Sequence, residues 1–258
     1  MTTTEAEEFR ALLQDPAAGH ARGLPPAWFL NVSAALYEEL DPARRDAWAH
    51  DLYTALCRTD GRVPLTVTHL WHTGTILPVL TETATRLGHD PAPFQSLAAA
   101  HHHALTGHNP SEHRWAATLE PALRRLYRDA YAYAAAYATA YDNAHAYALA
   151  NDFTPTDADT YGRDYADETT EPNARAFTEA NATANARATA TAYATEDPDA
   201  YALTFPGART RAYVRAAAAA PPQDPSAEAS RRTTACARLA DGLVASLNHG
   251  QDRQDRHL

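Results

Sequence analysis

Histidine is the residue type that most readily supplies chemistry in this sequence, because the chain has 13 histidines and several are grouped. His69 and His72 stand three residues apart, which places both on one face of a helix. A second group includes His101 and His108. Two imidazoles one helical turn apart, joined by a third from another helix, could ligate zinc or iron. Together with Trp71, the same residues could instead line a small-molecule pocket.

No carboxylate stands at the spacing that would complete such a metal site. The di-iron pattern Glu-x-x-His and the zinc pattern His-Glu-x-x-His are both absent from the sequence. His101 and His108 also share helical spacing with Phe94, Leu97 and Leu105, which is typical of histidines that are hydrogen-bonded inside a core. A structural role for the histidines therefore stays open beside the metal and pocket hypotheses.

The segment from Asp157 to Glu168 resembles the spacing of a calcium-binding loop. An EF-hand loop needs oxygen ligands at positions 1 and 3, glycine at position 6 and a bidentate glutamate at position 12. Asp157, Asp159, Gly162 and Glu168 occupy those positions, whereas Tyr161 stands where a further oxygen ligand is preferred. Calcium is thus one candidate ligand, and the alternative is an acidic loop between two helices.

The composition excludes several classes of function. The formal net charge is −10, so a nucleic-acid backbone is not the expected partner. All 22 basic residues are arginine, a bias that a high-GC bacterial genome produces without selection on function. We find no signal peptide and no apolar run of about 18 residues, so we expect a cytoplasmic protein without a membrane partner. Signatures of nucleophilic, phosphate-binding or dinucleotide-binding sites are absent, which favours a protein that is not an enzyme.

The elements that would position these residues are predicted to be helices. Apolar periodicity indicates helices over about 26–40, 42–60, 65–87 and 91–107. Gly74 and Pro78 should kink the third of them and make it the most plausible wall of a pocket. Helix starts are predicted where an Asp or Asn that can cap precedes a proline. Six such pairs occur: Asp15-Pro16, Asp41-Pro42, Asp90-Pro91, Asn109-Pro110, Asp197-Pro198 and Asp224-Pro225.

The most distinctive prediction is a helix of about 40 residues that begins at Asn109-Pro110 and ends before Thr154-Pro155. It would be roughly 60 Å long at 1.5 Å per residue. Positions 119–147 carry apolar or aromatic residues at a four–three spacing, which is typical of a coiled-coil seam. A second alanine run over 174–194 should pack antiparallel to it. Three tyrosines of the seam form a candidate interaction face: Tyr133, Tyr137 and Tyr147.

Together these patterns predict an all-α multi-helix bundle with one long Ala/Tyr-rich helix packed antiparallel on a second Ala-rich helix. The expected division is an N-terminal segment 1–25, a four-helix subdomain 26–108, a long-helix bundle 109–249 continuous with it, and a disordered tail 250–258. Cys57 and Cys236 are too few for a disulfide framework.

The function predicted first is a helical protein-interaction or scaffold protein, which would bind a second copy or a protein partner through the long helix. The alternative is a metal- or small-molecule-dependent helical enzyme, with its site between the kinked helix (His69, His72) and the histidine-rich helix end (His101–His108). A calcium-responsive helical module is a third hypothesis.

Overall fold

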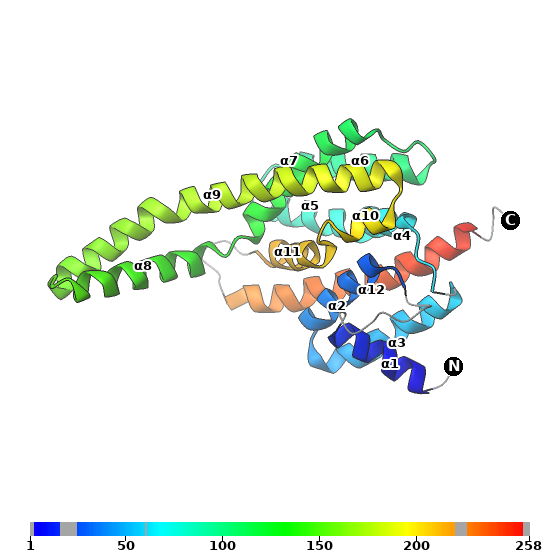
Figure 1. Ribbon diagram of the computed structural model, residues 1–258, viewed down its shortest axis with the longest axis horizontal. Coiled ribbons are helices and arrows are strands. Elements are labelled where there is room, and N and C mark those ends of the chain that lie inside the picture. The colour runs from blue at the N-terminus through cyan, green and yellow to red at the C-terminus, as the bar shows by residue number, and fades with distance from the viewer. Residues whose placement is uncertain (1–2, 16–24, 60, 220–225, 255–258) are drawn as a thin grey trace.

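The computed structural model describes residues 3–15, 25–59, 61–219 and 226–254, and within these ranges all regular structure is helical (Figure 1). The elements are α1 (Thr3–Gln14), α2 (Ala27–Glu39), α3 (Pro42–Arg58), α4 (Leu65–Trp71), the π-helical turn η2 (His72–Ile76), α5 (Leu77–Arg86), α6 (Ala92–Leu105), α7 (Glu112–Ala130), α8 (Tyr133–Ala150), α9 (Pro155–Thr195), α10 (Pro198–Ala202), α11 (Pro206–Ala218) and α12 (Ser226–Gln254). None of these helices is both long and apolar enough to cross a membrane, as far as the described residues go.

Acid-proline pairs start three helices as the sequence predicts. The Asp41 carboxylate accepts from the Ala43 amide at 2.8 Å, Asp90 does the same for Ala92 at 2.9 Å, and Asp197 caps α10. The prediction is wrong at Asn109, because Ser111 caps α7 and Asn109 bonds elsewhere. The two remaining pairs include residues outside the described ranges, namely Pro16, Asp224 and Pro225.

Most helices form one body, whose core is built from bulky side chains. Trp28, Trp71, Trp115, Phe29 and Tyr193 are among its largest fully buried residues. Core residues come from α1 and α2 as well as from α11 and α12, so helices of both predicted subdomains share one core. Helix α1, which the sequence analysis left without structure, joins this core through an apolar face and packs on α2 and α3.

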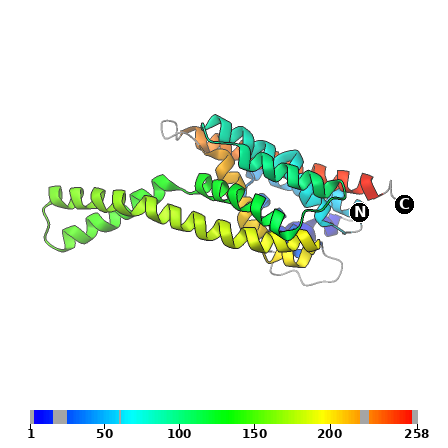
Figure 2. The ribbon, with the colours of Figure 1, turned by 90° about the horizontal axis from the view of Figure 1, so that it is seen from above.

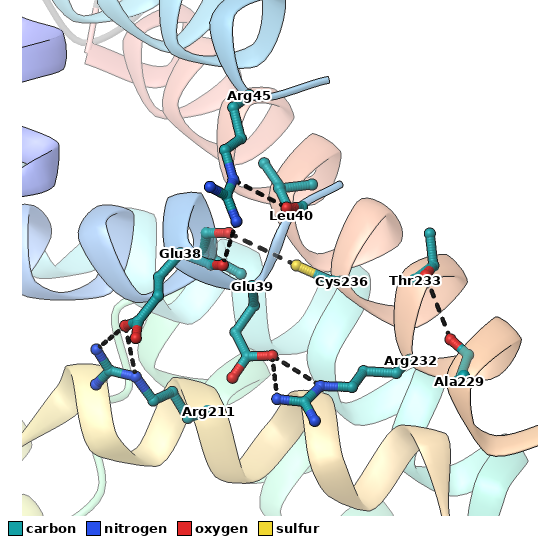
Figure 3. A network of polar contacts seen from close by, with 10 residues as sticks. Glu38, Glu39, Leu40, Arg45, Arg211, Ala229, Arg232, Thr233 and Cys236 are labelled. Atoms are coloured by element: carbon teal, nitrogen blue, oxygen red, sulfur yellow. Dashed lines mark hydrogen bonds and ion pairs between the residues drawn. The ribbon is translucent and has the colours of Figure 1, made fainter. Parts of the chain in front are cut away.

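The C-terminal end of α2 is where three other helices are fastened to it (Figure 3). Arg45 of α3 donates to the Glu38 carbonyl at 2.7 Å, and Arg211 of α11 pairs with the Glu38 carboxylate at 2.5 Å. Arg232 of α12 pairs with Glu39 at 2.6 Å. Cationic groups are favoured here because the last carbonyls of a helix carry partial negative charge. These contacts fix α11 against the body on the side that faces α2.

The predicted kink in the third helix takes the form of a π-helical turn. Helices α4 and α5 are joined through His72–Ile76, which contains Gly74. One π turn inserts an extra residue into the helix and changes which side chains face inward. Gly242 of α12 lies so close to Thr75 that a Cβ atom there would overlap the Thr75 side chain. The widened turn is therefore packed tightly between α6 and α12.

The fold class is confirmed, but the 40-residue helix is the second of the predicted pair and not the first. The segment predicted as one helix divides into α7 and α8 at Tyr131 and Ala132, where the backbone leaves the helical region. Helix α9 runs unbroken for 41 residues through Pro172. No local breaker stands at residue 131. The division instead follows the packing, because α7 packs on α9 and also covers the body with Leu119 and Leu123, whereas α8 packs on α9 in the arm.

Helix α9 and α8 project from the body as a two-helix arm (residues 133–170), which both views show (Figures 1 and 2). Small residues recur on α9 at every fourth position and all are buried: Ala158, Gly162, Ala166, Thr170, Ala174, Thr178, Ala182, Ala186 and Ala190. Since a helix turns about 100° per residue, a spacing of four moves this stripe by about 40° at each step. The drift lets one helix face α8 in the arm and then α7 and α10 in the body.

The predicted tail is partly helical. Helix α12 continues past Gly250 to Gln254, and residues 255–258 lie outside the described ranges. Gly250 packs near Val67 of α4, with an added Cβ coming 3.1 Å from that side chain. Contact with α4 thus continues beyond the point where the sequence predicts the last helix to end.

Candidate functional site

The structure brings together three of the predicted site histidines in the centre of the body. The Nδ1 atoms of His69 and His101 are 2.8 Å apart, so one nitrogen donates a proton to the other. The rings of His72 and His101 are stacked with centroids 4.4 Å apart. The histidine cluster, as we call His69, His72 and His101, comes from α4, η2 and α6. All three side chains are buried, with residue exposures of 6%, 2% and 0%.

Hydrogen bonds assign the tautomer of His72. Its Nδ1 is 2.7 Å from the Thr68 carbonyl, which can only accept, so Nδ1 carries the proton. The Nε2 atom is then an acceptor for the Tyr213 hydroxyl at 3.2 Å. Aromatic rings close the remaining sides, since Trp115 stacks on His69 and Tyr193 meets His101 edge-on. The imidazoles thus serve as polar pieces of a packed aromatic core.

Burial sets the protonation state of this cluster. Desolvation lowers the pKa of His69 to about 4 and that of His72 to about 3, and it lowers the pKa of His101 well below the usual value. All three imidazoles are therefore neutral at pH 7. They are also closed off from solvent, so a substrate cannot reach them without opening the body. Within the described ranges, no set of three or more His, Cys, Asp or Glu residues is placed to hold a metal ion.

The other two residues of the predicted pocket, Trp71 and His108, differ in where they lie. Trp71 is buried beside His72, with ring centroids 6.1 Å apart, and its indole donates to the Leu239 carbonyl of α12 at 2.9 Å. His108 is exposed beyond the end of α6, where its ring is 3.5 Å from the Thr106 hydroxyl. Three of the four predicted pocket residues, Trp71, His72 and His101, are therefore neighbours, whereas His108 lies apart from them.

The loop conformation predicted for the calcium-like segment is wrong. Residues 157–168 belong to the first turns of α9, where Thr154 is the N-cap and accepts from the Asp157 amide at 3.2 Å. On a helix, side chains two apart point to opposite sides, so Asp157 and Asp159 cannot face one ion together in this conformation. Asp159 instead accepts from the Tyr141 hydroxyl at 2.6 Å and pairs with Arg163. Glu168 is exposed on a later turn.

The tyrosines predicted as an interaction face lie on the arm. Tyr147 is 59% exposed and Tyr133 is 43% exposed. Tyr137 is half-buried beside Asp167 of α9, and burial together with that carboxylate raises its pKa. The apolar seam is thus buried in α7, at Leu119 and its neighbours, but its tyrosines face outward in α8. The arm's interface is built mainly from alanine, glycine and threonine, with Tyr141 and His145 packed on Gly162, so it does not depend on Tyr133 and Tyr147.

Exposed aromatic residues gather near the free end of the arm. The aromatic tip consists of Tyr147, Phe153, Tyr161 and Tyr165. The ring centroids of Tyr147 and Tyr161 are 6.3 Å apart, and those of Phe153 and Tyr161 are 5.8 Å apart. The interaction face predicted from the sequence does not include Phe153, Tyr161 and Tyr165, because these residues were expected in a loop between two helices. Tyr161 and Tyr165 are four residues apart, and this spacing in the sequence could have indicated that both lie on one face of a helix.

The arm is strongly acidic as well as aromatic. Between residues 133 and 170 the sequence holds seven acidic residues and one arginine, Arg163. That arginine is already paired with Asp159. The aromatic tip is therefore surrounded by uncompensated negative charge, which limits the partners that it can accept.

No protein-family model, curated protein or solved structure matches the chain.

Proposed function

We propose that this is a cytoplasmic protein-interaction module whose aromatic tip docks into an apolar groove rimmed by basic residues on a protein partner. The observation that carries the proposal is the gathering of four exposed aromatic side chains at the end of a projecting acidic arm. Tyrosine is enriched among the residues that dominate binding energy at protein interfaces. Large exposed apolar clusters on a soluble domain are a mark of interaction surfaces.

Packing within the arm gives no reason for aromatic residues at the tip. The two helices meet through Ala144, Ala148, Ala158 and Gly162, which allow close approach without large side chains. A ring such as that of Tyr147 remains more than half exposed after the hairpin has formed. Its apolar area, at about 25 cal/mol per Å², becomes available for binding when a partner covers it.

The negative charge of the arm favours a different protein over a second copy of this chain as the partner. Two arms meeting tip to tip would bring like charges together, which is unfavourable for a second copy of this chain. A nucleic-acid backbone would be repelled for the same reason. A groove with arginine or lysine at its rim satisfies both the rings and the carboxylates. Binding should then weaken as salt concentration rises, because salt screens the charged rim.

The enzyme alternative has less support. The histidine cluster is closed to solvent, and its imidazoles are held neutral inside an aromatic core. A general acid or base must come within hydrogen-bond reach of a substrate, directly or through one water. Nothing in the packing of α4, α6 and α12 around these histidines provides that access.

The proposal is tested with three forms of the full chain: wild type, the tip variant Tyr147→Ala/Phe153→Ala/Tyr161→Ala, and the control variant Leu203→Ala. Leu203 is exposed at the end of α10 on the body, so the control removes an apolar side chain away from the arm. Each form is immobilised and exposed to the soluble proteome of the source cells at low and at high salt. Retained proteins are quantified, and a candidate partner is then purified and titrated.

We expect a protein that the wild type and Leu203→Ala retain at low salt, and that the tip variant loses. With the purified partner, the tip variant should bind at least roughly tenfold more weakly, the equivalent of losing one interface hot spot. Retention of the same proteins by the tip variant and the wild type would contradict the proposal. A partner that proves to be this chain itself, detected by light scattering, would replace the heterologous partner with a homodimer.

A further inference from the structure

Arg209 of α11 is a buried cation without an anionic partner. It is 3% exposed, and among the described residues it is the one buried side chain with a permanent charge. Its Nη1 donates to the Thr189 hydroxyl at 2.8 Å, and its Nη2 donates to the Thr204 carbonyl at 2.9 Å. The guanidinium also lies 5.6 Å from the centre of the Tyr201 ring. All of these partners are neutral.

The charge of Arg209 is therefore left uncompensated by the protein. Every ion pair found in the described part of the chain joins other residues, and no carboxylate lies within salt-bridge distance of Arg209 there. In the same part of the chain its Nε–H has no hydrogen-bond acceptor. A buried charge is strongly unfavourable unless it is paired, so an arginine in this state is suited to receive an anion from outside.

A cavity of about 260 Å³ lies beside Arg209, between α7, α9 and α11. Its polar lining comes from Asn181, Asn185 and Arg215 in addition to Arg209. Arg215 is exposed, one and a half turns further along α11, so the cavity has one buried and one accessible guanidinium. The remaining lining is aromatic or alanine.

The aromatic part of the lining consists of the buried Tyr127 and two exposed phenylalanines. Phe177 is 50% exposed and Phe205 is 74% exposed. Phe205 also has a left-handed backbone, with a φ of 54°, although it is not a glycine. Such a conformation is strained in a non-glycine residue and tends to persist at functional sites. Here it caps α11 and leaves the phenyl ring beside the cavity instead of in the core.

We propose that this cavity binds a small organic carboxylate, with the carboxylate on Arg209 and Arg215 and an apolar body between Phe177 and Phe205. Both Nη2–H groups of Arg209 go to Thr204 and one Nη1–H goes to Thr189, so Arg209 offers its unpaired Nε–H to one carboxylate oxygen. The Arg215 guanidinium can supply the two parallel hydrogen bonds that match a planar carboxylate. The two guanidiniums favour an anion, and the apolar part of the lining favours an anion that carries an organic body over inorganic phosphate. A body the size of one aromatic ring fits the volume of the cavity. This site is separate from the aromatic tip and does not depend on the arm's proposed role.

The experiment measures thermal stability and calorimetric binding of the full chain with defined probes. Phenylacetate supplies the carboxylate and the ring, 2-phenylethanol supplies the ring without charge, acetate supplies the charge without the ring, and inorganic phosphate tests the anion class. Phenylacetate at tenfold above its Kd should raise the melting temperature by about 2–4 °C for a chain of this size. The other three probes should bind at least roughly tenfold more weakly, because each lacks either the charge or the aromatic ring.

Variants assign the binding to this cavity. Arg209→Met should abolish binding of phenylacetate, and without ligand it should melt no lower than the wild type, because it removes an unpaired buried charge. Arg215→Ala and Phe177→Ala change exposed side chains, so they should fold normally and weaken binding by about threefold to tenfold. The matched control is Arg211→Ala, which removes an arginine of the same helix that pairs with Glu38 away from the cavity.

Each possible result either supports or overturns the proposed carboxylate site. Loss of phenylacetate binding in Arg215→Ala and Phe177→Ala, with full binding in Arg211→Ala, supports the site even where Arg209→Met does not fold. Equal binding of phenylacetate and 2-phenylethanol, or no binding of phenylacetate at all, overturns the proposal. Stronger binding of phosphate than of phenylacetate overturns the assignment to a carboxylate. Unchanged binding in all cavity variants overturns the location.

Discussion

The body and the arm are stabilised by opposite uses of side-chain size. The body buries tryptophan and leucine around neutral histidines, whereas the arm holds two helices together through alanine, glycine and threonine. Aromatic rings follow the reverse pattern, because they are inside in the body and outside in the arm. A ring that is buried supports the fold, and a ring that is left outside a well-packed interface is available for something else. Tyrosine thus contributes mainly to the core in the body and mainly to the surface in the arm.

The largest expected effect is a loss of stability of the body at acid pH, because the buried histidine cluster lies in the body and not in the arm. The pKa of His69 falls from 6.5 to about 4 on folding and that of His72 to about 3, so the unfolded chain binds more protons between those values. Stability is then full above pH 6.5 and declines as the pH falls toward 4, by up to about 1.4 kcal/mol per pH unit for each histidine. Urea midpoints measured from pH 7.5 to 4.5 will show this slope. His101→Phe should flatten it, and a midpoint that stays constant between pH 6.5 and 5 would contradict the assignment.

The second-largest effect on stability is expected when an aromatic side chain in the core of the body is truncated. Trp115 is fully buried, stacks on His69 and donates its indole N–H to the Asn109 side chain at 3.0 Å. Trp115→Ala should lower the free energy of unfolding by about 3–5 kcal/mol, because it leaves a cavity and an unpaired amide. Urea unfolding followed by circular dichroism measures the change. A loss below 1 kcal/mol would mean that the body core is not close-packed around this ring.

In the arm, the damaging change is an added side chain and not a removed one. A Cβ at Gly162 would lie 3.0 Å from the Tyr141 ring, so Gly162→Leu forces the helices apart. We expect a cost of about 1–3 kcal/mol, confined to the arm. Amide hydrogen exchange should accelerate in α8 and in the first half of α9 but not in α12. Thr160→Leu, at an exposed position two residues away, is the control and should leave exchange unchanged.

The smallest effect on stability is expected at the aromatic tip. Tyr147→Ala should change the free energy of unfolding by less than about 0.5 kcal/mol, since the ring is mostly exposed and surface substitutions rarely do more. Chemical denaturation resolves a difference of that size from the effect of Trp115→Ala. A loss above 1 kcal/mol would give the tip a structural role and remove the contrast between the regions.

The sequence predicts those parts of the fold that local chemistry determines. Helix starts at Asp41 and Asp197 follow from capping, and the irregular turn near Gly74 follows from the glycine and the following proline. The all-helical class follows from periodicity and from alanine. Two of the histidines meet as spacing suggests, since His69 and His72 lie one turn apart and converge on α6.

The features of the structure that could not be predicted from the sequence depend on packing between distant segments. The division at Tyr131 has no local signal and arises because α7 packs on α6 and α11 as well as on α9, whereas α8 packs on α9 in the arm. Residues 157–168 read as a loop by their acidic pattern, but the stripe of small residues through Gly162 packs against Tyr141 and His145 and keeps them helical. The burial of Arg209 has no local signal, because arginine is normally exposed and its partners Thr189 and Thr204 come from other elements.

Helix α9 is held rigidly at one end only. At about 1.5 Å per residue its 41 residues form a rod of roughly 60 Å, which is buried in the core at Ala182–Tyr193 and, within the described part of the chain, is supported by α8 alone in the arm. A proline inside a helix removes one backbone hydrogen bond, so the rod is most compliant at Pro172, between the clamp and the tip. We therefore expect a lateral load on the tip to bend the helix at Pro172 before it disturbs the core, next to the exposed ion pair of Arg128 with Glu171 that joins α7 to α9.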